Sequence, residues 1–264
     1  MKISISSLFF AYSGKPVFNG LNAEFECGEA CRPLVILGPS GSGKTTLLKL
    51  LGGLLKIQKG NITFSPNPCF NEPCAAEHCI GMPRAAFMFQ EPRLLPWLTV
   101  LENVKAPLEK DLGSEKAVLR AKNFLSLVSL NDKENAYPKE LSGGEAQRVS
   151  MSRAFAWQAP LLLMDEPFQS LDIPLRLNLM DLAMSLLQST DPAGNDPRKR
   201  KFLVAVTHDP REAVYMAGRI IVLGKGGEGI VYDKTVDLSS NDRVYGSAAA
   251  VELEKEIIDK LNSV

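Results

Sequence analysis

The segment at residues 38–45 has the composition and spacing of a loop that binds phosphate. It reads Gly-Pro-Ser-Gly-Ser-Gly-Lys-Thr, follows an apolar run at 34–37 and opens a stretch with helical periodicity. Glycines let backbone N–H groups close around phosphate oxygens, and a helix N-terminus adds positive potential. We expect Lys44 to reach the outer phosphates and Thr45 to ligate Mg²⁺. The alternative, a structural glycine turn, is disfavoured by the position between strand and helix.

Two adjacent carboxylates, Asp165 and Glu166, follow a second apolar run at residues 161–164. Neighbouring carboxylates at the end of a buried strand are costly unless a cation or a reacting water uses them. We expect Asp165 to hold Mg²⁺ through water and Glu166 to orient or deprotonate an attacking water. The alternative is a pair of solvated carboxylates, and the phosphate loop in the same chain argues against it.

The segment Leu141-Ser142-Gly143-Gly144-Glu145 precedes a predicted helix that ends near residue 156. Ser142 and Glu145, three residues apart, can form a capping box, with the glycines making a tight entry. The same helix N-terminus is also suited to binding an anionic phosphate. Since one nucleotide needs only one cradle, the second would serve a nucleotide held by another subunit. The spacing does not decide between these two interpretations.

An α/β fold must position these segments. Apolar runs with strand character occupy residues 34–37, 161–164 and 202–206, and the helical stretches that follow them occupy 44–51, 175–187 and the residues from 211 onward. Strands alternating with helices predict a mostly parallel sheet covered on both faces. Ligands of such sheets bind at the carboxyl ends of the strands, where the phosphate loop and the carboxylates would meet.

The other segments differ in pattern from this alternation. Residues 1–37 alternate as strands do, with turns predicted at Ser13-Gly14 and Asn19-Gly20, and residues 60–92 predict short strands and loops. Residues 98–156 and 251–261 have helical spacing. The connection at 189–201 is polar and ends in Arg198-Lys199-Arg200-Lys201. We interpret it as a solvated surface loop, with a partner or anionic lipid contact as the alternative.

Composition narrows the function classes. The chain has 264 residues, 45% of them apolar, and its 30 Lys and Arg balance 30 Asp and Glu. These values predict one large globular domain, or a domain with a subdomain, and argue against a strongly basic nucleic-acid binder. Apolar stretches stay well short of the roughly 18 residues that a membrane span needs. Five cysteines, an odd number, indicate free thiols in a reducing compartment, by default the cytoplasm.

Four potential zinc ligands gather before residue 90. Cys69, Cys74, His78 and Cys79 have suitable chemistry, but their spacing is unlike the paired pattern of common structural zinc sites. We therefore interpret this region as an irregular surface insertion rather than a metal site.

Taken in order along the chain, the motifs resemble those of the ATP-binding subunits of ABC transporters. The matching segments are residues 38–45, Gln90 in Phe87-Met88-Phe89-Gln90, LSGGEAQRV at 141–149, LLLMDEPF at 161–168, Ser170-Leu171-Asp172 and Thr207-His208-Asp209. The LSGG segment discriminates this family from other proteins with a phosphate loop. The resemblance covers about residues 1–235, and Glu145 with Ala146 departs from the more common family sequence.

The resemblance implies the architecture. A P-loop NTPase (RecA-like) core with a mostly parallel sheet is expected, together with an antiparallel β subdomain and an inserted α-helical subdomain. Residues 1–264 would form a single ABC ATPase domain. Its expected parts are the nucleotide-binding core with the β subdomain at 1–90 and 160–235, the helical subdomain carrying LSGG at 91–159, and a C-terminal extension at 236–264.

Several roles are carried over by the resemblance. Tyr12 would stack on adenine, Gln90 would contact Mg²⁺ and sense the membrane partner, and His208 would contact the γ-phosphate. Ser142 and Gly144 would contact the γ-phosphate bound by the opposite subunit. The full expected nucleotide-binding set is Tyr12, Gly38, Pro39, Ser40, Gly41, Ser42, Gly43, Lys44, Thr45, Thr46, Gln90, Ser142, Gly143, Gly144 and Asp165. The expected catalytic residues are Glu166, His208, Lys44 and Gln90, and the expected metal ligands are Thr45, Gln90 and Asp165.

Within the family, residues 90–100 followed by Glu102-Asn103-Val104 look like the nitrate, sulfonate and taurine importers and their relatives for thiamine precursors. An apolar surface at Leu95, Trp97 and Leu98 would suit a groove for a short permease helix. Alternatively, these side chains pack only within the helical subdomain.

The resemblance implies an ATPase that uses ATP and Mg²⁺ to power solute import. The implied partners are a second ATPase subunit, giving a homodimer, a separate transmembrane permease, and a periplasmic or lipid-anchored solute-binding protein. The chain would act at the cytoplasmic face of the membrane. The alternative is an ABC ATPase acting on nucleic acid or ribosomes. Three features count against it: the net charge is zero, the chain has a single cassette, and Lys44 and Ser142 lie only 98 residues apart without sustained heptads. No nucleic-acid partner is therefore expected.

Overall fold

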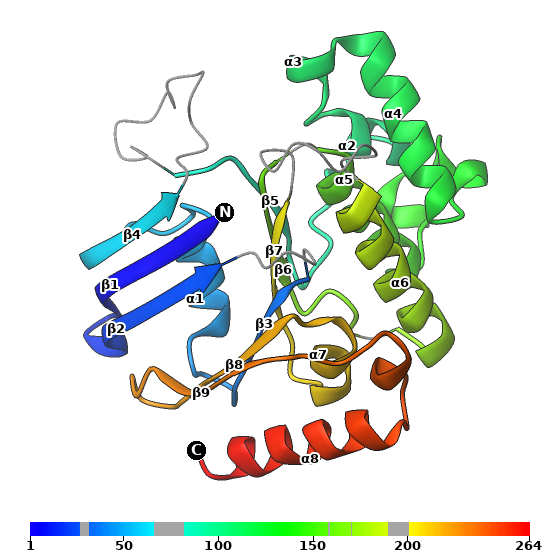
Figure 1. Cartoon of the computed structure of the whole chain (residues 1–264). Coiled ribbons are helices and arrows are strands. Elements are labelled where there is room, and N and C mark those ends of the chain that lie inside the picture. The colour runs from blue at the N-terminus through cyan, green and yellow to red at the C-terminus, as the bar shows by residue number, and fades with distance from the viewer. Residues whose placement is uncertain (27–31, 66–81, 158, 170, 190–200) are drawn as a thin grey trace.

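The computed structural model describes all residues except 27–31, 66–81, 158, 170 and 190–200, and its strands form two sheets (Figure 1). The antiparallel sheet has the order β2-β1-β4, from β1 (Lys2–Tyr12), β2 (Lys15–Glu26) and β4 (Lys59–Ser65). The larger sheet has the order β5-β6-β7-β3-β8-β9, from β3 (Leu34–Leu37), β5 (Ala85–Met88), β6 (Leu161–Asp165), β7 (Phe202–Val206), β8 (Arg219–Leu223) and β9 (Ile230–Thr235). Among the pairings of the described strands in this sheet, only that of β9 with β8 is antiparallel, so the predicted mostly parallel sheet is confirmed.

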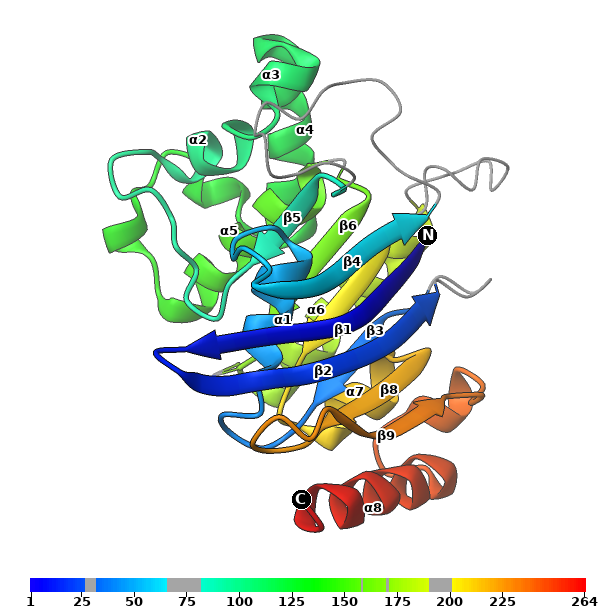
Figure 2. The same cartoon turned by 90° about the vertical axis from the view of Figure 1, so that its left-hand side faces the viewer.

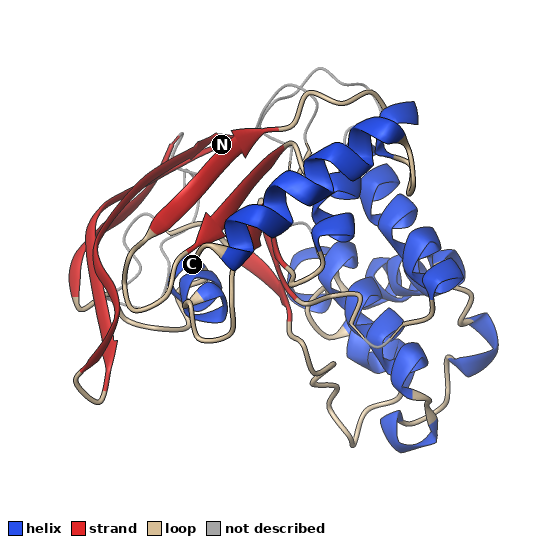
Figure 3. Ribbon diagram, turned by 90° about the horizontal axis from the view of Figure 1, so that it is seen from below, coloured by secondary structure: helices blue, strands red, loops and turns tan. Residues whose placement is uncertain are grey.

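The helices lie on both faces of the larger sheet. They are α1 (Lys44–Leu51), α2 (Val100–Lys105), α3 (Glu109–Leu112), α4 (Ser114–Leu127), α5 (Gly143–Ala156), α6 (Ile173–Ser189), α7 (Pro210–Met216) and α8 (Ala248–Asn262). Helix α1 lies between the two sheets, and the three-stranded sheet covers it from outside (Figure 2). The other helices gather on the opposite side of the larger sheet (Figure 3). Helices α2 to α5 belong to the chain between β5 and β6.

Alternation along the central strands divides the interior into two cores. Leu34 and Ile36 of β3 pack with the three-stranded sheet and α1, whereas Val35 and Leu37 pack with the helical side. Strands β6 and β7 alternate in the same way. Because both faces of these strands are buried, their sequences are apolar runs and not polar–apolar alternations.

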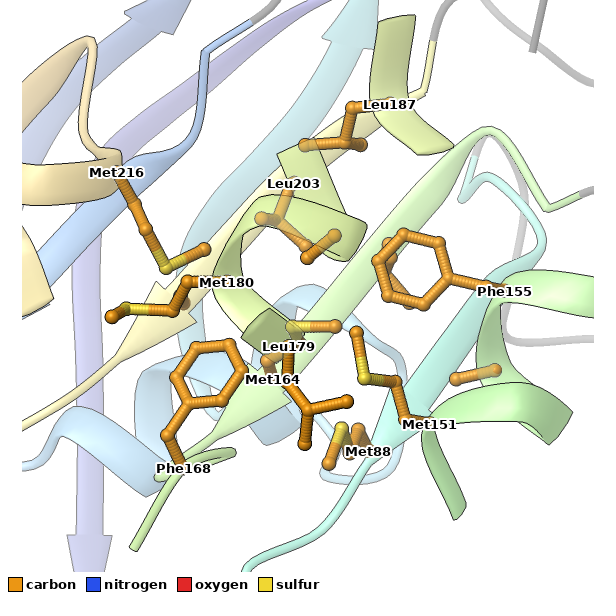
Figure 4. Close-up of a cluster of buried hydrophobic side chains, with 14 of the residues drawn as sticks. Met88, Met151, Phe155, Met164, Phe168, Leu179, Met180, Leu187, Leu203 and Met216 are labelled. Atoms are coloured by element: carbon orange, nitrogen blue, oxygen red, sulfur yellow. The ribbon is translucent and has the colours of Figure 1, made fainter. Parts of the chain in front are cut away.

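In the core on the helical side of the larger sheet, a methionine-rich cluster joins α5 to the sheet (Figure 4). Met151 and Phe155 of α5 pack toward Met88 at the end of β5 and Met164 at the end of β6. Phe168, in the loop after β6, closes the same cluster. Methionine fills irregular gaps, which suits a junction where strands, helices and a loop meet at different angles. The helix that begins with the LSGG segment is therefore anchored to the strand ends that carry Gln90 and Asp165.

The predicted turn at Ser13-Gly14 is confirmed, but the one at Asn19-Gly20 is wrong. Strand β2 runs unbroken through both residues. Leu8 pairs with Leu21 and Phe9 with Asn19, so Gly20 is an extra residue opposite β1, with φ of +82°. Gly20 thus forms a β-bulge, in which glycine adopts the left-handed backbone without a steric penalty.

Lys201 corrects the interpretation of residues 198–201 as a solvated run. Its side chain is buried, and Nζ donates to the carbonyls of Phe155 at 2.9 Å and Trp157 at 3.1 Å. Arg120 Nε donates to the carbonyl of Ala156 between them. Two cations thus cap the carbonyl end of α5, where the helix dipole is negative. The other three basic residues of this run lie outside the described residues.

Burial of Lys201 predicts a pH-dependent stability. Desolvation, assisted by the positive charge of Arg120, lowers the pKa of Lys201 to about 8. At pH values between this folded pKa and the ordinary pKa of 10.5, Lys201 holds its proton in the unfolded chain but not in the folded chain. The free energy of unfolding therefore rises with pH in this range. From pH 7 to pH 9.5, wild type should gain about 2 kcal/mol relative to Lys201→Met in urea denaturation. The exposed Lys255→Met serves as control and should follow the wild type. Parallel curves for wild type and Lys201→Met would contradict the prediction.

The five cysteines and His78 lie outside the described residues, so the interpretations of free thiols and of a surface insertion stay predictions. Within the described parts of the chain, no helix combines the length and apolar character that crossing a membrane requires.

Candidate active site

The loop between β3 and α1 is built on glycines that no other residue replaces without strain. At Gly43, with φ of +95°, an added Cβ would lie 2.5 Å from Val17 Cγ1 and 2.9 Å from Phe18 Cζ. At Gly38 it would lie 2.6 Å from the carbonyl oxygen of Leu223. Gly41, with φ of +80°, faces open space. The loop is thus packed against the protein at Gly38 and Gly43 and open at Gly41, as a loop that binds an external anion must be.

Lys44 folds back into this loop. Its Nζ donates to the carbonyls of Gly38 at 2.8 Å and Pro39 at 2.9 Å. Burial lowers its pKa, while the charges of Glu166 and Asp165 oppose that shift. The Ser42 hydroxyl is buried and has no hydrogen-bond partner among the described residues. A phosphate bound in the loop would offer the Lys44 ammonium charged acceptors, which form stronger hydrogen bonds than the two carbonyls to which it now donates. Thr46 is buried in the first turn of α1, and Ser40 lies in the loop.

Thr45 and Asp165 meet at the carboxyl ends of β3 and β6. Thr45 Oγ1 donates to Asp165 Oδ1 at 3.0 Å. Burial raises the pKa of Asp165 and the Glu166 charge adds to the rise, whereas the Thr45 hydrogen bond opposes it. A hydroxyl beside a buried carboxylate is an oxygen donor set suited to Mg²⁺, and a cation there would stabilise the ionised carboxylate.

Glu166 is held in an uncommon backbone conformation at the centre of the site. Its φ is +47°, and its N–H donates to the carbonyl of Val206 at 2.9 Å. Such a conformation in a non-glycine residue persists where the surroundings enforce it, often at functional sites. Gln90 Nε2 donates to Glu166 Oε2 at 3.4 Å, and His208 Nδ1 lies 3.3 Å from the same oxygen. The fold therefore brings Gln90, Glu166 and His208 together from the ends of three strands.

Sequence reasoning missed the contacts of two glutamines near this cluster. Gln169 Oε1 accepts from Gln90 Nε2 at 2.6 Å, a shorter bond than the one from Gln90 to Glu166. Gln147, buried on α5, donates from Nε2 to the carbonyl of Pro167 at 2.9 Å. Gln169 stands three residues after Glu166 and Gln147 lies within the LSGG segment, but neither spacing indicates a partner. Only the fold supplies these contacts.

The capping-box interpretation of the LSGG segment is confirmed. Ser142 Oγ accepts from the Glu145 N–H, and Glu145 Oε2 accepts from the Ser142 N–H at 2.7 Å. An added Cβ would meet nothing at Gly143 and would lie 3.6 Å from Leu171 Cδ2 at Gly144. Binding of a phosphate held by another subunit stays a prediction, because it needs a second chain.

Tyr12 ends β1, where its ring is exposed and packs edge-on against Phe10 with centroids 4.9 Å apart. An exposed aromatic ring can take part in stacking, but the predicted contact with adenine remains a prediction.

Comparison with known proteins identifies the family. A family model described as ABC transporter matches residues 18–169. The chain belongs to the ABC transporter family. It is 36% identical over 248 residues to the aliphatic sulfonates import ATP-binding protein SsuB of Corynebacterium glutamicum, covering 94% of this chain and 89% of that protein. It is 38% identical over 226 residues to the taurine import ATP-binding protein TauB of Escherichia coli O157:H7, covering 85% of this chain and 80% of that protein.

Solved structures of this family have the same fold. Two dimeric structures of the ABC transporter cassette MJ0796 match with TM-scores of 0.72 and 0.71 at 30% identity. Each match covers 90% of this chain and all of the cassette chain, and the second structure is a post-hydrolysis state with ADP and Pi bound. The predicted P-loop NTPase fold, family membership and ATPase activity of our chain are therefore confirmed.

Proposed function

We propose that this ABC protein is the ATP-binding and ATP-hydrolysing subunit of an importer for sulfonates or related small anions such as taurine or nitrate, acting through a separate permease. Its relatives are sulfonate and taurine import ATP-binding proteins. The observation that carries the proposal is the convergence of Gln90, Glu166 and His208 beside the paired Thr45 and Asp165.

Each side chain has a role that its position supports. Lys44 and the loop at 38–45 would bind the β- and γ-phosphates of ATP. Glu166 would accept a proton from the attacking water, and His208 would hold that water and the γ-phosphate. Gln90 would align Glu166 through its hydrogen bond. Mg²⁺, held by Thr45, Gln90 and Asp165 directly or through water, would supply neutralisation of phosphate charge.

The active form we propose contains two copies of the chain. The phosphate loop of one copy would face Ser142 and Gly144 of the other, with Tyr12 on the adenine. We also propose the division into a core at 1–90 and 160–235, a helical subdomain at 91–159 and an extension at 236–264. A solute-binding protein would complete the system at the membrane.

A cleft beside the Gln90 segment is the proposed permease contact. It has a volume of about 200 Å³ and is lined by Ala86, Phe87, Leu95, Asn103, Ala106, Pro107, Arg153, Ala154 and Trp157. Asn103 accepts from the Leu95 N–H and donates to the carbonyls of Leu95, Leu98 and Thr99, which shapes the loop that forms one wall. Trp97 in this loop is 70% exposed. An exposed aromatic beside an apolar cleft suits a short helix from the permease.

Recovery of the partner from native membranes tests this function. A tagged chain should co-purify with a permease and a solute-binding protein, and Trp97→Ala should reduce the permease yield about tenfold through loss of a hot-spot aromatic. Leu119→Ala is the matched control, because Leu119 is 63% exposed but lies on α4 outside the cleft lining. Recovery of ribosomes or DNA instead of a permease would overturn the proposal.

A further inference from the structure

Arg176 connects the loop before α6 with the loop that carries His208. It lies on the first turn of α6, after Leu171 and Asp172. Its Nη1 donates to Asp209 Oδ2 at 3.0 Å and lies 3.4 Å from Glu212 Oε1. Its Nη2 donates to the carbonyl of Leu171 at 3.3 Å. One planar guanidinium therefore bridges the loop before α6 and the loop that carries the histidine.

One side of this ion-pair network holds the residues before and after His208. Thr207 Oγ1 donates to Glu212 Oε2 at 2.5 Å and accepts from the Asp209 N–H at 3.1 Å. Glu212 is 5% exposed, and burial raises its pKa while the charge of Arg176 opposes the rise. Both neighbours of His208 in sequence are thus hydrogen-bonded into the network, although the histidine side chain is exposed.

The other side of the ion-pair network, at Leu171, lies beside the LSGG segment. The Leu171 side chain lies 3.6 Å from the position that a Cβ on Gly144 would occupy. Leu171 therefore lies beside Gly144, and hydrogen bonds of Arg176 connect Leu171 to Asp209, next to His208. In the proposed dimer, Gly144 faces the nucleotide of the partner subunit, whereas His208 faces the nucleotide of its own.

We propose that Arg176 is a positioning residue that couples the LSGG segment of a subunit to His208 of the same subunit. The nucleotide held by the partner subunit would thereby influence hydrolysis of the nucleotide at that His208. This inference rests on the proposed function. Arg176 touches neither Glu166 nor His208 among the described contacts, so it acts by fixing the loop at 207–209. A planar guanidinium suits this task because its donors have fixed directions.

A double-mutant cycle on the full chain tests the coupling. Arg176→Met should lower kcat for Mg-ATP about tenfold and leave KM within about twofold, since the nucleotide contacts are untouched. Asp209→Asn should lower kcat to a similar extent, because asparagine keeps the N-cap of α7 but weakens the ion pair. Arg176→Lys should restore part of the rate. If the residues act together, the double variant should lose about tenfold in kcat and not about a hundredfold.

Arg219→Met provides the matched control. Arg219 pairs with Asp233 on β8 and β9, with Nε donating to Oδ1 at 2.7 Å, and its loss should leave kcat within about twofold. Additive effects of the two substitutions, or unchanged kcat in folded Arg176→Met protein, would overturn the proposal. Should Arg176→Met not fold, an unchanged kcat in Asp209→Asn would overturn it, and a reduced one with unchanged KM would support it. Full activity of His208→Ala would instead contradict the proposed role of the histidine. The His208 variant therefore distinguishes a failure of the proposed function from a failure of the Arg176 proposal.

Discussion

Replacement of Glu166 by glutamine is expected to lower the rate of ATP hydrolysis by about 10²- to 10⁴-fold, the usual contribution of a general base. The amide keeps the shape of the side chain and can still contact Gln90 and His208, but it cannot accept the proton of the attacking water. The phosphate loop and Lys44 are unaffected, so ATP affinity should stay within about threefold. Phosphate release and ATP titration of the purified chain measure the two quantities.

An ATP-bound dimer should accumulate in the same variant. Since ATP favours the closed form and hydrolysis resets it, blocking the chemistry keeps the closed population high. Size-exclusion chromatography with excess ATP, repeated at several protein concentrations, detects the dimer. The control is Glu115→Gln, an exposed carboxylate on α4 that should keep both wild-type rate and wild-type elution. A variant that binds ATP and elutes only as a monomer at every concentration would contradict the two-copy mechanism.

The second large effect is expected at Lys44. Lys44→Met removes the ammonium that now donates to the carbonyls of Gly38 and Pro39 and would donate to phosphate oxygens when ATP binds. One charged hydrogen bond contributes about 1.5–3 kcal/mol, so ATP affinity should fall about 10- to 100-fold. Calorimetric titration with Mg-ATP measures the loss, and kcat/KM should fall with it.

Two measurements separate loss of the phosphate contact from collapse of the loop. The thermal midpoint of Lys44→Met without nucleotide reports on the fold, and we expect a small change, because losing two carbonyl contacts is balanced by removing a buried charge. Lys56→Met, an exposed lysine after α1, should leave ATP affinity unchanged. Wild-type affinity in folded Lys44→Met protein would mean that this loop is not the phosphate site.

Comparison of the expected and observed elements shows why some predictions succeeded. The run at 34–37, the glycine loop and the helix from Lys44 to Leu51 agree with β3 and α1 residue for residue. The strands at 161–164 and 202–206 agree to within one residue with β6 and β7. Each of these signals is local, because a strand buried on both faces must be apolar at every position and a phosphate loop needs its glycines in sequence.

The failures arose where a local signal has two structural solutions. Asn19-Gly20 is typical of a tight turn, but pairing of β2 with β1 on both sides of Gly20 makes it a bulge. Lys201 belongs to a basic run typical of solvent, but the carbonyl end of α5, more than 40 residues earlier in the chain, offers it two acceptors. In both cases the deciding partner comes from a distant segment.

The sequence by itself determined the family, the order of the motifs and the types of the groups that would bind and hydrolyse ATP, because these reside in short segments whose chemistry depends on neighbouring residues. Only the tertiary structure decided which groups meet. Parallel pairing of β3, β6 and β7 places Thr45 against Asp165 and His208 against Glu166, and the position of α6 places Arg176 between two loops. Such contacts join residues tens of positions apart, and spacing along the chain carries no information about the geometry that unites them.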